Sequence, residues 1–308
     1  MKIAFFEVKP EEREFFKKKL EGVDAEVLFF EETINNHKLP ADYDVISVFI
    51  NSKITAEVLN KLPNLKYIQT RSTGYDHIDL VECYKRGIMV SNVRGYAGPA
   101  VGEFAFGLLL EAIRKLYIAI HRVKRNDFYY KDLKGIEIEG KTIGVLGLGT
   151  IGRQIVKIAR GFGADVIGFS RHPKNLGIRE TFILEEVLER SDFLFIALPL
   201  TPQTKNLINK ENINHFKGNV IINPARAEII EREVYLTFNG IIAADVLPDW
   251  GLAKKDNIIA TPHMAYYTKE ALRRIMQISL DNLMDFLDGK VPRFCLKEEC
   301  KKYFKECV

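Results

Sequence analysis

The sequence is poor in cysteine, and it has neither a large excess of one charge nor a long apolar run. None of its four cysteines shows the CxxC spacing of metal sites. Reduced thiols are therefore expected and no metal site is predicted, although a disulfide or a metal clip stays open for the three cysteines near the C-terminus. The four residues are Cys83, Cys295, Cys300 and Cys307.

The charge balance gives no reason to expect a nucleic-acid partner. The net charge is only +4, and the basic residues are spread along the chain. The most apolar stretch, residues 104–113, is too short to span a bilayer. Residues 1–14 turn charged before an apolar segment of secretory length can form. We therefore expect a soluble, cytoplasmic protein that binds neither nucleic acid nor a membrane.

Two series of strand-like runs alternate with helical patterns, one in about the first hundred residues and one over 141–263. Such alternation favours parallel sheets covered by helices, and 308 residues suit two domains. An apolar helix over 99–125, expected to be buried on several sides, and an amphipathic helix over 268–287 join the two series. We predict an α/β fold with two doubly wound parallel-sheet domains and a ligand-binding cleft between them.

A glycine-rich turn follows the first strand of the second series. Gly147 permits a tight turn, Gly149 has no side chain to block a pyrophosphate, and Gly152 lets the next helix pack close to the strand. The N-terminus of that helix offers unpaired N–H groups to phosphates. A strand before the turn and a helix after it predict a dinucleotide site, which includes Thr150 and Ile151.

The end of the next strand, residues 165–169, indicates which dinucleotide binds. An NAD site has an acid at the C-terminal end of this strand, but here the one acid, Asp165, lies at the opposite end. Ser170, Arg171 and Lys174 follow the strand and would attract a 2′-phosphate. We predict that NADP is preferred over NAD; the alternative is an ordinary solvated basic loop.

Two polar side chains stand at the ends of later strands. Arg226 follows "NVIINPA" and His263 ends "NIIATPH", at the carboxyl edge where open α/β sheets bind ligands. Each alone is compatible with a structural role. Beside a dinucleotide site, however, Arg226 can bind a carboxylate or polarise a carbonyl, and His263 can transfer a proton near neutral pH.

Taken together, the motifs resemble those of the D-2-hydroxyacid dehydrogenases. The resemblance covers about residues 1–290, and the individual motifs look like those of D-lactate dehydrogenases and of glyoxylate and hydroxypyruvate reductases. It rests on the order of "RSTGYDHIDL" (71–80), "NVRGYAGPAVGEFAFGLLL" (92–110), "GLGTIGRQ" (147–154), "LPLTPQT" (198–204), "NPARAEII" (223–230), "ADV" (244–246) and "TPHMAYYT" (261–268).

The resemblance implies how the domains are assembled. A flavodoxin-like substrate-binding domain would comprise residues 1–97 and be completed by 267–308, and a Rossmann NAD(P)-binding domain would comprise 98–266. The family usually forms a homodimer through the middle domain, so a homodimer is expected.

The resemblance also implies roles for individual residues. His263 would protonate the keto oxygen while hydride arrives from C4 of the nicotinamide, and Arg226 would bind the carboxylate and the keto oxygen. Asp245 would hold the nicotinamide carboxamide. The substrate carboxylate would bind the amides of Ser72, Thr73 and Gly74 under Tyr96, and Val101, Leu198, Pro199 and Thr204 would border the cofactor.

One position departs from the family pattern. The family normally has a glutamate five residues after the aspartate of "ADV", and this glutamate keeps the histidine protonated; here the position is Trp250. If one residue is deleted, Asp249 falls at the glutamate position, and we hypothesise that Asp249 replaces it as a catalytic residue. The alternative is that Asp249 is solvated, with Asp245 or water orienting His263.

The sequence thus predicts an NAD(P)-dependent oxidoreductase that acts on CH–OH groups and reduces a small 2-keto acid such as pyruvate, glyoxylate or hydroxypyruvate. Two alternatives stay open. One is a catalytically weak dinucleotide-sensing protein of the same fold, and the other is an enzyme for a longer or phosphorylated acid.

Overall fold

The computed structural model describes residues 1–39 and 42–296. The chain divides into two compact units. The N-terminal unit combines Met1–Tyr96 with the segment that begins at Lys269, and the central unit comprises Ala97–Thr268. The cleft between the domains stays a prediction, as do the roles of the two domains.

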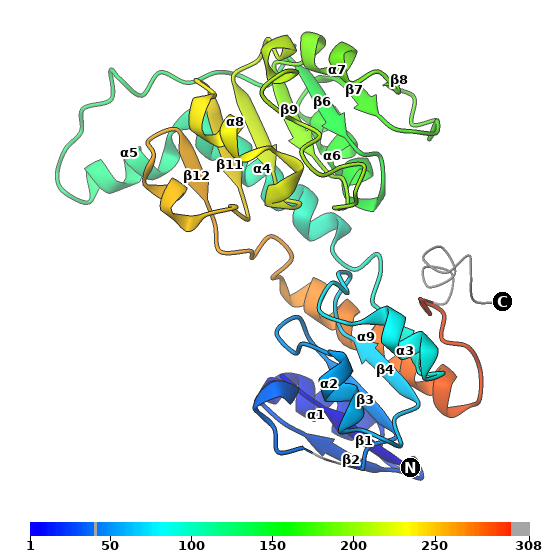
Figure 1. The fold of residues 1–308 in the computed structure, drawn as a ribbon. Helices are drawn as coiled ribbons and strands as arrows, with labels where there is room; N and C mark the ends of the chain where they lie inside the picture. The colour runs from blue at the N-terminus through cyan, green and yellow to red at the C-terminus, as the bar shows by residue number, and fades with distance from the viewer. Residues whose placement is uncertain (40–41, 297–308) are drawn as a thin grey trace. The chain divides into compact units, whose positions relative to one another are not determined.

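The N-terminal unit contains a five-stranded sheet in the order β2-β1-β3-β4-β5, in which every pairing is parallel (Figure 1). This is the flavodoxin-like order. The strands are β1 (Lys2–Phe5), β2 (Glu26–Phe29), β3 (Val45–Val48), β4 (Tyr67–Thr70) and β5 (Met89–Ser91), and the helices are α1 (Pro10–Lys19), η1 (Ile34–Asn36), α2 (Ala56–Asn60), α3 (Leu80–Lys85) and α9 (Lys269–Leu287).

Helices cover both faces of this sheet. Neighbouring residues of a strand point to opposite faces, so each strand contributes side chains to both. Phe5 packs with Phe16 of α1 and Leu283 of α9 on one face. Ala4 and Ile46 pack with residues of α2 and α3 on the other. The segment from Lys269 thus completes the hydrophobic core of the first 96 residues.

The central unit contains a seven-stranded parallel sheet in the order β12-β11-β10-β9-β6-β7-β8. The chain starts at β6, adds β7 and β8 on one side, and then crosses to add β9 on the other, which makes the β6/β9 boundary the switch point of the sheet. The strands are β6 (Thr142–Leu146), β7 (Asp165–Phe169), β8 (Arg179–Thr181), β9 (Phe193–Ile196), β10 (Val220–Asn223), β11 (Ile241–Ala244) and β12 (Ile258–Ala260).

Helices cover both faces of the central sheet. Residues of α4 and α6 pack with Val145 and Phe195 on one face, and residues of α7 and α8 pack with Leu146 and Leu194 on the other. The helices are α4 (Gly98–Arg114), α5 (Leu116–Val123), α6 (Thr150–Gly161), α7 (Leu184–Arg190), α8 (Arg232–Thr237), η2 (Ile213–His215), η3 (Ala227–Ile229) and η4 (Trp250–Lys254). The predicted α/β class with two parallel, helix-covered sheets is confirmed.

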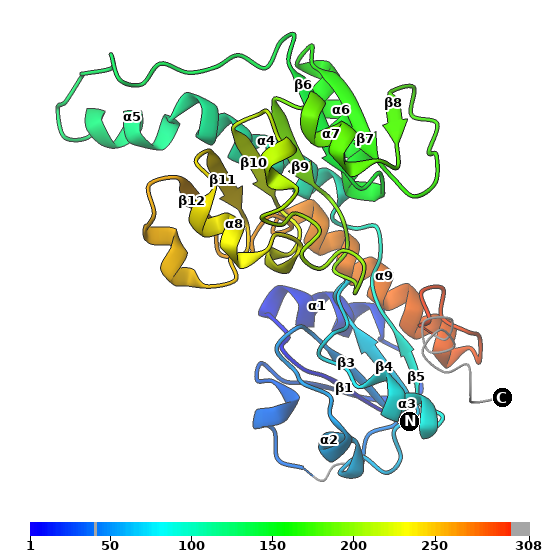
Figure 2. The same cartoon turned by 45° about the horizontal axis from the view of Figure 1, so that its top comes forward.

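The helix predicted over 99–125 is wrong as a single buried helix. Lys115 adopts a left-handed conformation with φ of 52° and divides it into α4 and α5. α4 buries ten residues, whereas α5 buries none and extends away from the sheet of its own unit (Figures 1 and 2). The apolar residues of the second half are therefore exposed.

In the described part of the chain, no helix has the length and apolar character needed to cross a membrane, and no group of three His, Cys, Asp or Glu side chains is arranged for a metal. Cys83 is buried and Cys295 is partly buried. The predictions for Cys300 and Cys307 lie outside the described residues, and the expected cytoplasmic location stays a prediction.

Candidate active site

The glycine-rich turn lies at the switch point of the central sheet. Gly147 follows β6 with φ of +97°, and a Cβ there would lie 2.7 Å from the carbonyl oxygen of Ala197. A Cβ on Gly152 would overlap the carbonyl oxygen of Gly147. A Cβ on Gly149, by contrast, would meet nothing within 4 Å. The turn is therefore tightly packed against protein at two glycines and open at the third, directly before the N-terminus of α6.

The residues predicted to border the cofactor surround this turn. Thr150 and Ile151 begin α6. Val101 lies in α4, which packs along α6. Leu198 and Pro199 follow β9, the strand on the other side of the switch point, and the Thr204 hydroxyl donates to the Pro199 carbonyl at 2.6 Å. All six residues belong to the central unit. A Cβ on Gly147 would lie 3.0 Å from the Leu198 side chain, and one on Gly98 of α4 would lie 2.8 Å from that of Thr150, so α4, α6 and the segment after β9 meet at this turn.

The loop after β7 carries the residues predicted to bind a 2′-phosphate. The Ser170 hydroxyl donates to the His172 carbonyl at 2.6 Å, while Arg171 and Lys174 are exposed. Sequence reasoning missed Glu180 of β8, whose carboxylate accepts the backbone amides of Lys174 at 2.5 Å and Leu176 at 2.8 Å. The carboxylate of Glu180 therefore holds the backbone of the same loop that carries Arg171 and Lys174.

Arg226 and His263 come to one edge of the sheet, because β10 and β12 flank β11 and all three are parallel. The buried side chain of Asn223, which ends β10, accepts from the Ala225 amide at 3.0 Å and donates to the Arg226 carbonyl at 2.9 Å. These bonds fix the turn that carries Arg226. The positive charge of Arg226 lowers the pKa of His263.

Asp245, which follows β11, organises the loop that carries His263. Its buried carboxylate accepts hydrogen bonds from the Thr261 hydroxyl at 2.6 Å, the Met264 amide at 2.9 Å and the Ala265 amide at 2.8 Å. Its backbone carbonyl accepts the His263 amide at 2.8 Å. His263 itself has φ of 55°, a conformation that is uncommon for residues other than glycine. The loop is held on both sides of this strained residue.

The imidazole of His263 is half-buried and subject to opposing influences. Burial lowers its pKa below the ordinary 6.5, and the positive charge of Arg226 lowers the pKa further. The carboxylate of Asp245 raises it. Asp245 is therefore the carboxylate whose charge supports the protonated form of His263.

Asp249 has other partners. One carboxylate oxygen accepts the Gly251 amide at 2.8 Å, which caps η4, and the other lies 3.4 Å from the Arg232 guanidinium. These two contacts lower the pKa of Asp249, the amide more than the guanidinium. The structure thus joins Asp249 to Gly251 and Arg232 and does not bring it to His263; Trp250 beside it is exposed.

The loop predicted to bind the substrate carboxylate follows β4 in the N-terminal unit. Its three carbonyl oxygens all accept hydrogen bonds, Ser72 from the Val93 amide at 3.0 Å, Thr73 from the Asn92 side chain at 2.8 Å and Gly74 from the Ser72 hydroxyl at 2.6 Å. Within the described residues, the backbone amides of the same three residues donate to no protein acceptor. Three consecutive amides are available for an anion.

Tyr96 is the last residue of the first segment of the N-terminal unit. Its side chain is buried, with 7% exposed, and its carbonyl accepts the Arg274 guanidinium of α9 at 2.8 Å. The substrate-binding role predicted for Tyr96 stays a prediction.

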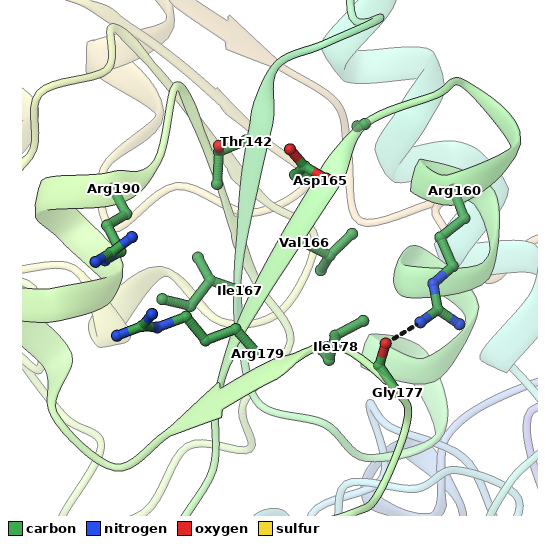
Figure 3. Close-up of a pocket in the computed structure, with 10 residues that line it drawn as sticks. Thr142, Arg160, Asp165, Val166, Ile167, Gly177, Ile178, Arg179 and Arg190 are labelled. Atoms are coloured by element: carbon green, nitrogen blue, oxygen red, sulfur yellow. Dashed lines mark hydrogen bonds between the residues drawn. The ribbon is translucent and has the colours of Figure 1, made fainter.

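A separate concavity of about 560 Å³ lies at the amino ends of β6, β7 and β8 (Figure 3). Arg160, Arg179 and Arg190 line it, but Arg179 and Arg190 both pair with Glu186, and Arg160 donates to the Gly177 carbonyl. Open α/β sheets bind ligands at the opposite, carboxyl edge. This concavity is therefore not the candidate active site.

Comparison with known proteins agrees with this geometry. Residues 106–265 match the family described as D-isomer specific 2-hydroxyacid dehydrogenase, NAD binding domain. The chain is 33% identical to 2-hydroxyacid dehydrogenase homolog 1 of Schizosaccharomyces pombe, over 93% of this chain and 96% of that protein. It is 35% identical to D-3-phosphoglycerate dehydrogenase of Methanocaldococcus jannaschii over 81% of this chain, but the match spans only 51% of that longer protein.

A solved structure shows the same fold. D-lactate dehydrogenase of Aquifex aeolicus, complexed with NAD and lactic acid, superposes with a TM-score of 0.83 at 30% identity, covering 93% of this chain and 96% of that one. The chain belongs to the D-isomer specific 2-hydroxyacid dehydrogenase family, as its motifs predicted. It is an oxidoreductase of the class that acts on CH–OH groups with a nicotinamide dinucleotide.

Proposed function

We propose that the protein reduces a small 2-keto acid, such as glyoxylate, hydroxypyruvate or pyruvate, to the corresponding 2-hydroxy acid. The observation that supports this most is the placement of Arg226 and His263 at one carboxyl edge of the sheet that carries the glycine-rich turn. A reduced nicotinamide would supply a hydride to the keto carbon from C4. The chain's own residues would supply the proton and the positive charge.

In this proposal, His263 donates its proton to the keto oxygen as the carbon accepts hydride, so that the carbonyl becomes a hydroxyl and the imidazole becomes neutral. Arg226 binds the carboxylate and the keto oxygen through its planar guanidinium, which matches two oxygens at once. The free amides of Ser72, Thr73 and Gly74 bind the carboxylate from the N-terminal unit.

We assign the orientation of His263 to Asp245. The buried carboxylate of Asp245 already holds Thr261, Met264 and Ala265, and its charge raises the pKa of His263. For Asp249 to serve as the replacement glutamate, its carboxylate would have to leave Gly251 and Arg232. Since its three donors hold the Asp245 carboxylate in the interior, they favour support of the loop over the predicted contact with the nicotinamide carboxamide.

For the cofactor, we propose a preference for NADPH. Arg171 and Lys174 are exposed beside Ser170, and Glu180 is occupied by two backbone amides rather than presented to a ribose. Arg171→Ala should raise KM for NADPH about tenfold and leave KM for NADH nearly unchanged, because a charge-assisted hydrogen bond to phosphate is lost. Arg179→Ala, in the concavity at the other edge, is the matched control. Equal KM changes for both cofactors would count against the preference.

For the assembly, we propose a homodimer that buries α5. Five of its eight residues are exposed and apolar (Leu116, Tyr117, Ile118, Ile120 and Val123), and Phe128, Tyr129 and Tyr130 follow with more than half of each side chain exposed. Exposed apolar patches of this kind mark interfaces. Ile120→Lys should convert a dimer into a monomer in light scattering after gel filtration; a wild-type monomer would overturn the assignment.

The first experiment is an absorbance assay of cofactor oxidation, with NADPH and NADH each tested against glyoxylate, hydroxypyruvate and pyruvate. A phosphorylated 2-keto acid is included as a further substrate. Turnover with a small acid that is lost in Arg226→Gln supports the proposal. Cofactor binding without turnover of any acid would instead favour a dinucleotide-sensing protein.

A further inference from the structure

Side-chain groups link the substrate-carboxylate loop to a histidine that the proposed reaction does not use. The Ser72 hydroxyl donates to the Gly74 carbonyl at 2.6 Å and lies 2.7 Å from the Thr70 hydroxyl. The Thr70 hydroxyl in turn lies 3.1 Å from Nε2 of His77. We call this chain of contacts the hydroxyl relay.

The direction of every bond in the hydroxyl relay follows from the Gly74 carbonyl at one end. The Gly74 carbonyl can only accept, so Ser72 uses its single hydroxyl proton there. Ser72 must then accept from Thr70, and Thr70, having donated its proton, must accept from His77. His77 therefore carries a proton on Nε2.

The hydroxyl relay is shielded from solvent. Thr70 is fully buried and only 3% of Ser72 is exposed, so water does not readily replace a missing partner. Burial lowers the pKa of His77, while the charges of Glu7 and Asp76 raise it. Protonation of Nδ1 would leave the Nε2 donor in place.

His77 is held independently of the loop that it supports. Its carbonyl accepts the Ile54 amide at 2.8 Å, and the Asp79 amide donates to the Ile54 carbonyl at 2.8 Å. The Asp79 side chain caps α3 through the Glu82 amide. One end of the hydroxyl relay is thus attached to a rigid turn, and the other holds the carbonyl of Gly74.

We propose that His77 and Thr70 are positioning residues for the substrate carboxylate, because the hydroxyl relay turns the Gly74 carbonyl inward and leaves the amides of Ser72, Thr73 and Gly74 directed to a ligand. This proposal rests on the proposed 2-keto acid reductase activity. It assigns no chemical step to His77.

Thr70→Val tests the proposal with a side chain of nearly the same shape. The loop loses an ordered donor, so KM for glyoxylate should rise about tenfold, while KM for the cofactor, which binds the central unit, should stay unchanged. Thr70→Ser keeps the hydroxyl and should restore KM for glyoxylate to within about twofold of wild type. An unchanged KM in Thr70→Val, or an equal defect in Thr70→Ser, would overturn the proposal.

The protonation site of His77 gives a second test that needs no stable variant. Nitrogen-15 NMR of the imidazole in the wild-type protein should show the neutral ring protonated on Nε2; a proton on Nδ1 would overturn the hydroxyl relay. The two hypotheses fail in different ways. A wild-type protein without turnover would refute the proposed function, whereas the NMR result decides the relay regardless of activity.

Discussion

The loop after β4 and the loop after β12 both follow the carboxyl end of a parallel strand, yet they are held in opposite ways. In the loop of Ser72–Gly74 the carbonyls are bonded and the amides are left for a ligand. In the loop of His263 a buried carboxylate takes up the amides of Met264 and Ala265. An anion receptor needs free N–H groups, whereas a general acid needs a fixed orientation and a negative charge nearby.

The largest effect should come from removing the acid in the second loop. His263→Asn should lower kcat for glyoxylate reduction about 10²- to 10⁴-fold, because a positioned proton donor contributes that much, with cofactor binding kept. Steady-state kinetics and cofactor titration measure both quantities. His215→Asn, an exposed histidine paired with Glu189, is the matched control. A kcat within threefold of wild type would assign the proton to another group.

The next effect concerns the carboxylate that holds this loop. Asp245→Asn replaces one carboxylate oxygen by an NH2 group, which would face the hydrogen-bond donors of the loop instead of accepting from them. We therefore expect kcat to fall about 100-fold as His263 loses its orientation. The free energy of unfolding should drop by about 1–3 kcal/mol. Asp249→Asn removes a carboxylate with the same chemistry and should change kcat less than threefold. A larger defect in Asp249→Asn than in Asp245→Asn would restore the glutamate-replacement hypothesis.

The loop of His263 should also make the reaction depend on pH. Reduction needs protonated His263, whose pKa is lowered by burial and by Arg226, so kcat/KM for the keto acid should fall as pH rises through a pKa below 6.5. Oxidation of the hydroxy acid needs the neutral ring and should fall as pH drops through the same pKa. Asp245→Asn removes the charge that raises this pKa and should move both limbs to lower pH. Limbs above pH 6.5 would contradict this balance of charges.

The smallest effect should come from removing one of the three groups that donate hydrogen bonds to the Asp245 carboxylate. Thr261→Val removes the 2.6 Å hydroxyl contact and leaves the amides of Met264 and Ala265 in place. Stability should fall by about 0.5–1.5 kcal/mol in denaturant unfolding, and kcat by less than about fivefold. Thr261→Ser should restore both values. A loss as great as that of Asp245→Asn would mean that the hydroxyl alone holds the loop.

Much of the fold could be read from local patterns. The alternation of strands and helices predicted two parallel α/β domains, and the glycine spacing predicted the turn after β6, because a positive φ at Gly147 and the contact of Gly152 leave no room for a side chain. The short strand β8 was missed because Arg179–Thr181 has no apolar run to mark it. The break at Lys115 was missed because α5 continues the apolar pattern of α4 without any glycine or proline.

The sequence by itself determined the α/β class, the family and the residue types that could carry the chemistry, since these depend on periodicity, on backbone conformation and on ordered motifs. Only the tertiary structure decided which of two nearby aspartates serves the loop of His263. A carboxylate reaches only a few ångströms, and whether it meets an amide 20 residues away, as Asp245 meets Ala265, depends on the pairing of β11 with β12. For the same reason, the partners of Glu180 and the hydroxyl relay became visible only in the folded chain.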